Sequence, residues 1–192
     1  MNCNSRSKTV FMMLLCLSLM GTGCTSQWIK VALADLPVLA QMALNIGNLV
    51  TTLQSGKQLS PGDAEAIQNI SNQANRDLHL LQTLYDEYEA NPGASAIQKI
   101  QNAIADIDQN LPALLQATHI SDPALSVRVT AAVNLIVTTV NSFAALIPQP
   151  TGAAAAQKAA AHKTGVVPHP KDLKKQWNLQ VCGATIPGCE VK

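Results

Sequence analysis

The stretch IQKIQNAIADIDQNLPAL, residues 97–114, decides the fold of this chain. Its large apolar residues recur at gaps of three and four, which places them on one stripe of an α-helix. Similar spacing recurs within residues 39–53, 67–88 and 129–147. The stripe of the first stretch consists of Ile97, Ile100, Ile104, Ile107, Leu111 and Leu114. Since a helix buries such a stripe against neighbours, the sequence predicts four helices packed together.

Short segments rich in glycine, proline and polar residues separate the four patterns. They read SGKQLSPGD (55–63), NPGAS (91–95), HISDP (119–123) and, after the last pattern, IPQP (147–150). We expect Asp122 or Ser121 to cap the helix that follows, with Pro123 in its first turn. Short connections favour antiparallel neighbours, so residues 24–150 are predicted to form an all-α, antiparallel four-helix bundle domain.

Two prolines and one glycine interrupt the helical patterns. Pro37 predicts a break between a short segment near Trp28 and the first main helix, and Pro112 predicts a kink or a restart of the third helix. Gly47 either permits a close approach of two helices or is merely tolerated.

The fourth pattern allows two interpretations. It carries no charge from Val129 to Ile147, and a span of that length can cross a membrane. Its polar residues are costly when they face lipid and therefore favour a bundle helix. These residues are Thr130, Asn134, Thr138 and Asn141.

The amino-terminal residues predict a signal peptide. MNCNSRSK (1–8) has two basic residues and no acid, and VFMMLLCLSLM (10–20) is an apolar run of eleven residues. A membrane-spanning helix needs about 20 residues, so this run is too short to be one. A positive start, a short apolar centre and small residues after it are typical of a secretory signal peptide, here residues 1–23.

Gly21-Thr22-Gly23-Cys24 resembles the lipobox of bacterial lipoproteins. The resemblance implies that Cys24 is acylated on its sulfur and becomes the new amino terminus after cleavage. It also implies a lipid anchor on the non-cytoplasmic side of the cell envelope, at the outer membrane if one exists, because Thr25 rather than aspartate follows the cysteine. The resemblance covers residues 1–24. The small residues also suit an ordinary signal peptidase, which leaves Cys24 unmodified.

The cysteines predict one disulfide bond. Cys3 and Cys16 lie in the signal, and if Cys24 carries lipid, then Cys182 and Cys189 remain to pair. They are the first and last residues of the segment CGATIPGC, whose glycines and proline help the chain to reverse direction. A metal site of two thiolates is the alternative, although it lacks close spacing and a nearby histidine.

Charge divides the mature chain into an acidic body and a basic tail. Residues 24–152 have five basic and ten acidic side chains, and residues 153–192 have six lysines against two acids. We predict an Ala/Lys/Pro-rich linker over 151–176 and a small disulfide-closed tail over 177–192. The tail can contact anionic lipid or the acidic body. Nucleic acid is not expected as a partner, because the tail has only Trp177 to stack on bases.

No motif in the chain predicts catalysis, a cofactor or a metal. None of the four histidines, His79, His119, His162 and His169, has a histidine or cysteine three or four residues away. Acidic residues gather at Asp86, Glu87 and Glu89 and at Asp106 and Asp108. Such carboxylates can cleave glycosides, but a solvated helix face explains them more simply.

These observations favour a non-enzymatic binding or structural role at a membrane surface. The expected partners are the membrane, through the lipid on Cys24, and another envelope protein. One alternative is an inhibitor or immunity-type protein that sequesters an enzyme, which a small helical bundle with an acidic face can do. The other alternative is a cell-wall hydrolase.

Overall fold

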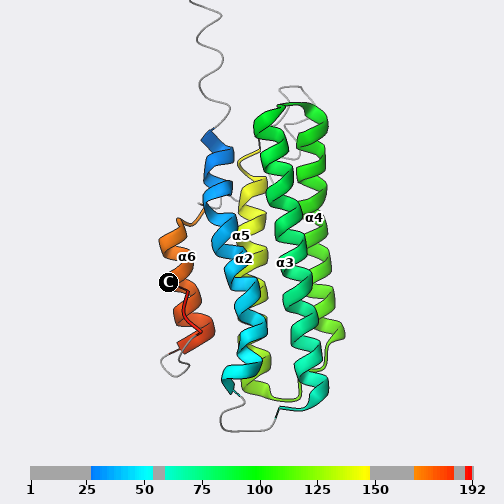
Figure 1. Ribbon diagram of the computed structural model, residues 1–192, viewed down its shortest axis with the longest axis vertical. Coiled ribbons are helices and arrows are strands. Elements are labelled where there is room, and N and C mark those ends of the chain that lie inside the picture. The colour runs from blue at the N-terminus through cyan, green and yellow to red at the C-terminus, as the bar shows by residue number, and fades with distance from the viewer. Residues whose placement is uncertain (1–26, 54–58, 148–166, 184–188, 192) are drawn as a thin grey trace, which may run out of the picture.

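The protein is an antiparallel four-helix bundle with a helical tail docked against it. The computed structural model describes residues 27–53, 59–147, 167–183 and 189–191. Helices α2 (Gln27–Leu53), α3 (Pro61–Ala90), α4 (Ala94–Ala117) and α5 (Pro123–Ala144) run alternately up and down (Figure 1). These ranges contain no strand. The predicted all-α bundle is therefore confirmed.

The beginnings of two helices follow from their local sequences. The Ser60 hydroxyl accepts a hydrogen bond from the Asp63 amide at 3.0 Å and caps α3. The Asp122 carboxylate accepts from the amides of Ala124 and Leu125, at 2.8 and 3.0 Å, and caps α5. Each cap satisfies amides that lack a helical partner and stabilises its helix by roughly 1 kcal/mol. Asp122, one of the two predicted caps, performs this role.

The apolar stripes form the core of the bundle. In α4 the central residues of the stripe are buried, and Ile97 and Leu114 at its two ends are partly buried. In α5 the whole stripe is buried, namely Val129, Val133, Ile136, Val140, Phe143 and Ile147 just beyond the helix. Neighbouring helices along the chain contact one another, and α2 also contacts α5, which closes the bundle.

The predicted break at Pro37 is wrong, because α2 is continuous through it. The ring of Pro37 lies on the exposed side of the helix, where water can bond the carbonyl that loses its helical partner. The adjacent Leu36 and nearby Leu39 are buried and fix both sides of the proline to the core. Helix α4 likewise continues past Pro112 to Ala117 without a restart.

Within the described residues, two helices are long and apolar enough to cross a membrane by length and composition alone, namely Trp28–Val50 and Pro123–Ala144. Both are packed in the bundle, and about half of each span is buried inside it. In α5 the polar residues Asn134 and Thr138 are exposed, as expected of a bundle helix. The core helices of a bundle are as long and as apolar as a membrane span. Length and composition therefore do not support a membrane span here.

The chain after the bundle is more ordered than its composition suggests. Residues predicted to be an extended linker instead form α6 (Pro170–Trp177), followed by a π-helical turn, η2 (Asn178–Cys182). The proposed boundary at residue 176 therefore falls inside α6. The reason is tertiary: Leu173, Trp177 and Val181 recur every four residues and are buried where α6 contacts α2 and η2 contacts α5. Residues 148–166, most of the predicted linker, lie outside the described residues.

Candidate functional site

The C-terminal tail, defined here as residues 167–183 and 189–191, is closed by the predicted disulfide bond. The sulfurs of Cys182 and Cys189 are bonded, with their Cα atoms 5.5 Å apart. Both cysteines are buried. The pairing leaves neither thiolate to bind a metal, which decides between the two interpretations of these cysteines.

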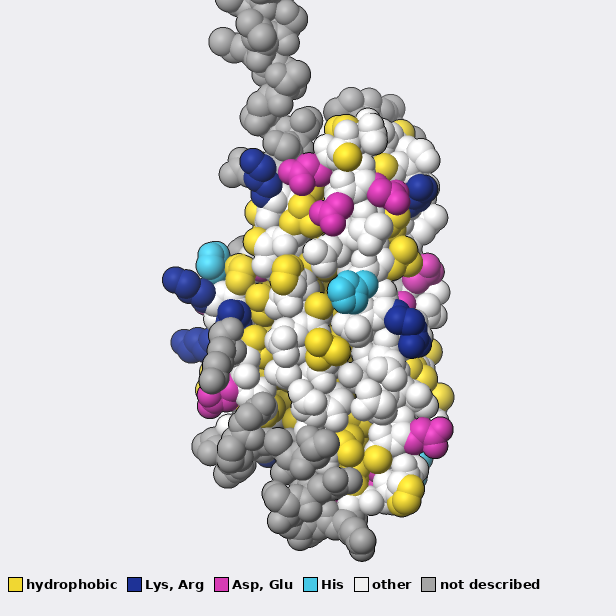
Figure 2. Space-filling view, in the orientation of Figure 1, with side chains coloured by type: hydrophobic (Ala, Val, Ile, Leu, Met, Phe, Trp, Pro, Cys, Tyr) yellow, Lys and Arg dark blue, Asp and Glu magenta, His cyan; other side chains and the backbone are white. Residues whose placement is uncertain are grey.

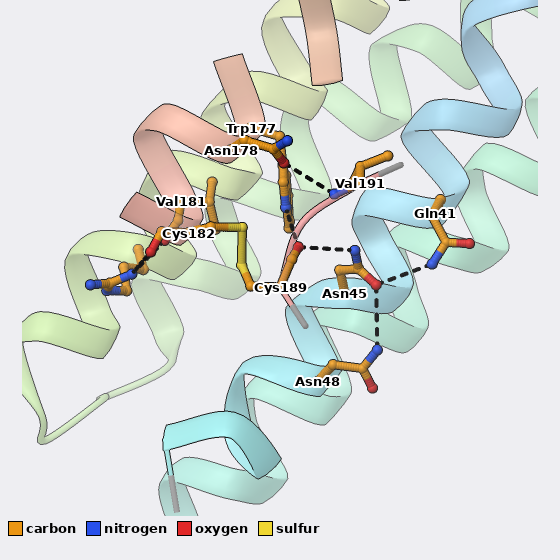
Figure 3. The surroundings of a disulfide bond; sticks show 10 residues. Gln41, Asn45, Asn48, Trp177, Asn178, Val181, Cys182, Cys189 and Val191 are labelled. Carbon is orange, nitrogen blue, oxygen red and sulfur yellow. Dashed lines mark hydrogen bonds between the residues drawn. A yellow bond between two sulfur atoms is a disulfide. The ribbon is translucent and has the colours of Figure 1, made fainter. Parts of the chain in front are cut away.

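A single carbonyl joins the end of the tail to its own helix and to the bundle (Figure 3). The indole Nε1 of Trp177 donates to the carbonyl oxygen of Cys189 at 3.0 Å. The side-chain amide of Asn45, in α2, donates to the same oxygen at 3.3 Å. Because Asn45 and Trp177 are both buried, these hydrogen bonds are shielded from competing water.

The amide of Asn45 is itself held in place by two neighbours along α2. Its Oδ1 accepts from Gln41 Nε2 at 3.1 Å and from Asn48 Nδ2 at 3.3 Å (Figure 3). This arrangement fixes which end of the Asn45 amide faces the tail. A buried polar network of this kind specifies one docked position, because a shifted tail leaves the amide unsatisfied.

Arg128 of α5 binds the other end of the disulfide-closed segment. One guanidinium nitrogen donates to the carbonyl oxygens of Val181 and Cys182, both at 2.7 Å. These are terminal carbonyls of η2, and a cation there also complements the partial negative charge of a helix end. Gly183 then leaves the turn with φ of 61°, a left-handed conformation that favours glycine.

An unusual buried acid lies in α2, the helix that α6 contacts. Asp35 of α2 is 1 % exposed, and neither of its carboxylate oxygens has a hydrogen-bond partner within the described chain. Burial raises the pKa of Asp35 to about 6, while the charge of His169 lowers it. His169 caps α6, since its Nδ1 accepts from the Lys171 amide at 3.2 Å.

An aromatic cluster fills the end of the bundle where α2 begins. The ring of Trp28 lies 5.6 Å from that of Tyr85 and 5.4 Å from that of Tyr88, and Phe143 packs against Tyr85 at 6.4 Å. Burial raises the pKa of the Tyr85 phenol, which keeps it protonated. We assign the cluster to packing.

An open polar pocket lies at the opposite end, between the start of α3 and the end of α4. Its volume is about 400 Å³, and Glu65, Asn69 and His119 are among its lining residues. Asp63 in the pocket wall already has a structural role, because its carboxylate accepts a hydrogen bond from the Ser121 amide at 2.9 Å. This bond lowers the pKa of Asp63. The pocket therefore joins two helix ends and presents no free buried group to a ligand.

The candidate catalytic residues from the sequence are not brought together. Among the described residues, no group of three histidine, cysteine or acidic side chains is placed to hold a metal ion. The histidines His79, His119 and His169 are exposed on separate elements, and His162 lies outside the described residues. Asp86, Glu87, Glu89, Asp106 and Asp108 are exposed; Lys99 pairs with Glu87 at 3.4 Å and Asn141 donates to Asp108.

Charged side chains of both signs are spread over the visible face, with local concentrations of each sign (Figure 2). Acidic side chains gather near the end where α2 begins and α3 ends, and basic ones gather along α6. In α6 the three lysines are Lys171, Lys174 and Lys175, accompanied by Asp172. The basic character predicted for the tail is therefore displayed on the side of the bundle.

Comparison with known proteins gives no relative for this chain. No family model matches it, and neither the curated proteins nor the solved structures contain a match. Cys24 lies outside the described residues. The most organised candidate site is therefore the docked C-terminal tail with its disulfide.

Proposed function

We propose that this chain is a membrane-anchored lipoprotein of the cell envelope with a non-enzymatic binding or structural role. The observation that carries the proposal is the buried Cys182–Cys189 bridge. Lasting disulfides belong to oxidising compartments outside the cytoplasm, which is where the signal-like residues 1–23 would deliver the chain. The pairing also leaves Cys24 as the remaining cysteine after those residues.

The position of Cys24 supports a bundle held close to the membrane. Helix α2 begins at Gln27, three residues after Cys24, and so few residues span at most about 10 Å. An acyl group on Cys24 would therefore hold the start of α2 beside the lipid. The end of α3 and the start of α4 lie at that same end of the bundle (Figure 1), so the polar pocket at the other end would face away from the membrane.

The anchor is tested with Cys24→Ser and a matched control, Cys16→Ser, which changes a cysteine within the signal. We expect wild type and Cys16→Ser to incorporate labelled fatty acid and to sediment with membranes. Cys24→Ser should incorporate none, because serine has no sulfur to acylate. Equal labelling of Cys24→Ser and wild type would contradict the proposal.

The binding role is tested by site-specific photo-crosslinking in intact membranes. Among the described residues, Val127 and Leu179 are the most exposed large apolar side chains, each 68 % exposed. They lie on the contacting elements α5 and η2. A crosslinker at either position should give one discrete adduct, while one at Gln109 of α4 serves as the control. Absence of any adduct, together with release of wall fragments by the purified protein, would favour the hydrolase.

A further inference from the structure

Asp35 is the most anomalous side chain in the described structure. Buried carboxylates are almost always paired or hydrogen-bonded, because moving an unpaired charge out of water costs several kcal/mol. Asp35 is buried with both oxygens unpartnered within the described residues. A group of this kind requires an explanation such as a switch, a bound ion or an uncharged state.

The charged groups around Asp35 do not neutralise it. In α2 the other charged residue is Lys30, which is exposed, and in α5 the single charged residue is Arg128, whose guanidinium binds the Val181 and Cys182 carbonyls. In α3, burial raises the pKa of Asp77, while a 2.8 Å hydrogen bond from Gln73 and the charge of Arg76 lower it.

The tail supplies the charge that acts on Asp35. That charge belongs to His169, at the start of α6. The tail also carries Lys171, Asp172, Lys174 and Lys175 on α6 and Glu190 near its end. Neither carboxylate oxygen of Asp35 accepts a hydrogen bond within the described residues.

We propose that the tail is a proton-linked docking element, in which uncharged Asp35 holds the start of α6 against α2 and ionised Asp35 shifts the tail toward an undocked state. Two structural observations support this direction. Helix α6 contacts α2, and His169 at its start is near enough for its charge to act on Asp35, so we expect departure of the tail to expose this acid to water. The tail buries Leu173, Trp177 and Val181 against the bundle, but the contacts that close the bundle join α2, α3, α4 and α5 to one another without it, so these contacts can persist when the tail separates.

The direction of the pH dependence follows from linkage. Burial raises the pKa of Asp35 from 3.8 to about 6 in the docked tail, whereas a hydrated Asp35 returns to its ordinary value. Docking thus takes up a proton between these two values, so its stabilising effect is complete below about pH 4 and is lost as the pH rises through 6. Linkage gives a fall of about 10- to 100-fold in the docking equilibrium from pH 4 to pH 7.

Hydrogen exchange of the full-length protein, with its disulfide intact, tests the proposal. Protection of residues 170–182 is compared with protection of α4 between pH 4 and pH 7, after correction for the intrinsic exchange rate. We expect protection of the tail to fall by about 10- to 100-fold while α4 stays constant. Equal changes in both regions, or no change in the tail, would overturn the proposal.

Two variants and one direct titration complete the test. Asp35→Asn keeps the shape but removes the ionisation, so the tail should remain protected across the whole pH range. Asp172→Asn removes an exposed carboxylate from α6 and should retain the wild-type profile. If Asp35→Asn fails to fold, carbon NMR of the Asp35 carboxyl in the wild type decides instead: a pKa near 4 contradicts the proposal, and one near 6 supports it.

Discussion

The four-helix core and the C-terminal tail are stabilised by different sets of interactions. The core is a continuous set of apolar stripes, in which residues such as Ile104 and Phe143 fill the space between helices. The tail also packs Leu173, Trp177 and Val181 against the bundle. In addition it depends on one disulfide and on hydrogen bonds from the Trp177 indole, Asn45 and Arg128. Loss of one contact should therefore weaken the core in proportion to the volume lost, but should release the tail as a unit.

The largest effect should come from the core. Phe143→Ala removes a fully buried ring that packs against Tyr85, and such truncations cost roughly 3–5 kcal/mol of unfolding free energy. Denaturation by guanidinium measures this loss. Leu80→Ala, at a side chain that is 53 % exposed, is the control and should change stability by less than about 0.5 kcal/mol. Similar losses for both variants would contradict the assignment of the core.

Removing the disulfide should affect the tail and spare the core. The double variant Cys182→Ala, Cys189→Ala opens a loop with a sequence separation of 7, and the chain-entropy relation gives a cost of roughly 2–3 kcal/mol. We expect lower hydrogen-exchange protection in α6 and unchanged protection in α4. If α4 also loses protection, then the tail and the core unfold as one cooperative unit. This result would contradict the separate release of the tail.

Arg128→Met should produce a smaller effect of the same kind. The methionine keeps much of the apolar stem but leaves the Val181 and Cys182 carbonyls without their donor, which costs roughly 1–2 kcal/mol. Exchange of the tail amides measures the change. Arg76→Met is the control, because Arg76 is exposed and donates to Gln73 of its own helix. A tail equally protected in both variants would show that Arg128 is dispensable.

The smallest effect should come from Gly47, where α2 approaches α3. A Cβ atom there would lie 3.1 Å from the Ser71 hydroxyl, and this hydroxyl is held by a 2.7 Å hydrogen bond to the Ala43 carbonyl. We expect Gly47→Ala to lose up to about 1 kcal/mol despite the better helix propensity of alanine. Gly62→Ala meets nothing closer than 3.9 Å and should not be destabilising. Thermal melts compare the two.

The same division explains what the sequence could predict. The stripe of Ile100, Ile104 and Ile107 is local, so it predicts a helix with a buried face, and Asp122 before Pro123 predicts a cap. The predicted break at Pro37 is wrong because buried neighbouring residues maintain the helix. Rules based on the local sequence do not include this tertiary packing. The pairing of Cys182 with Cys189 could be predicted from the number of cysteines and from the oxidising compartment that the signal-like residues 1–23 predict.

The tail could not be predicted in the same way, because its partners are distant in sequence. Asn45 meets Cys189 across 144 positions, and Arg128 meets Val181 across 53. The four-residue spacing of Leu173, Trp177 and Val181 was a visible signal, but it was short and lay among lysines and prolines. The burial of Asp35 could not be predicted from the sequence, because there it is simply one acid among the apolar residues of α2.

Intact-mass analysis of the mature protein from its own membranes, with and without reduction, tests the central claim most directly. We expect a chain that begins at Cys24, carries added acyl mass and gains about 2 Da on reduction, for the two hydrogens taken up by Cys182 and Cys189. An unmodified chain with no gain on reduction would contradict both the lipid anchor and the disulfide-closed tail.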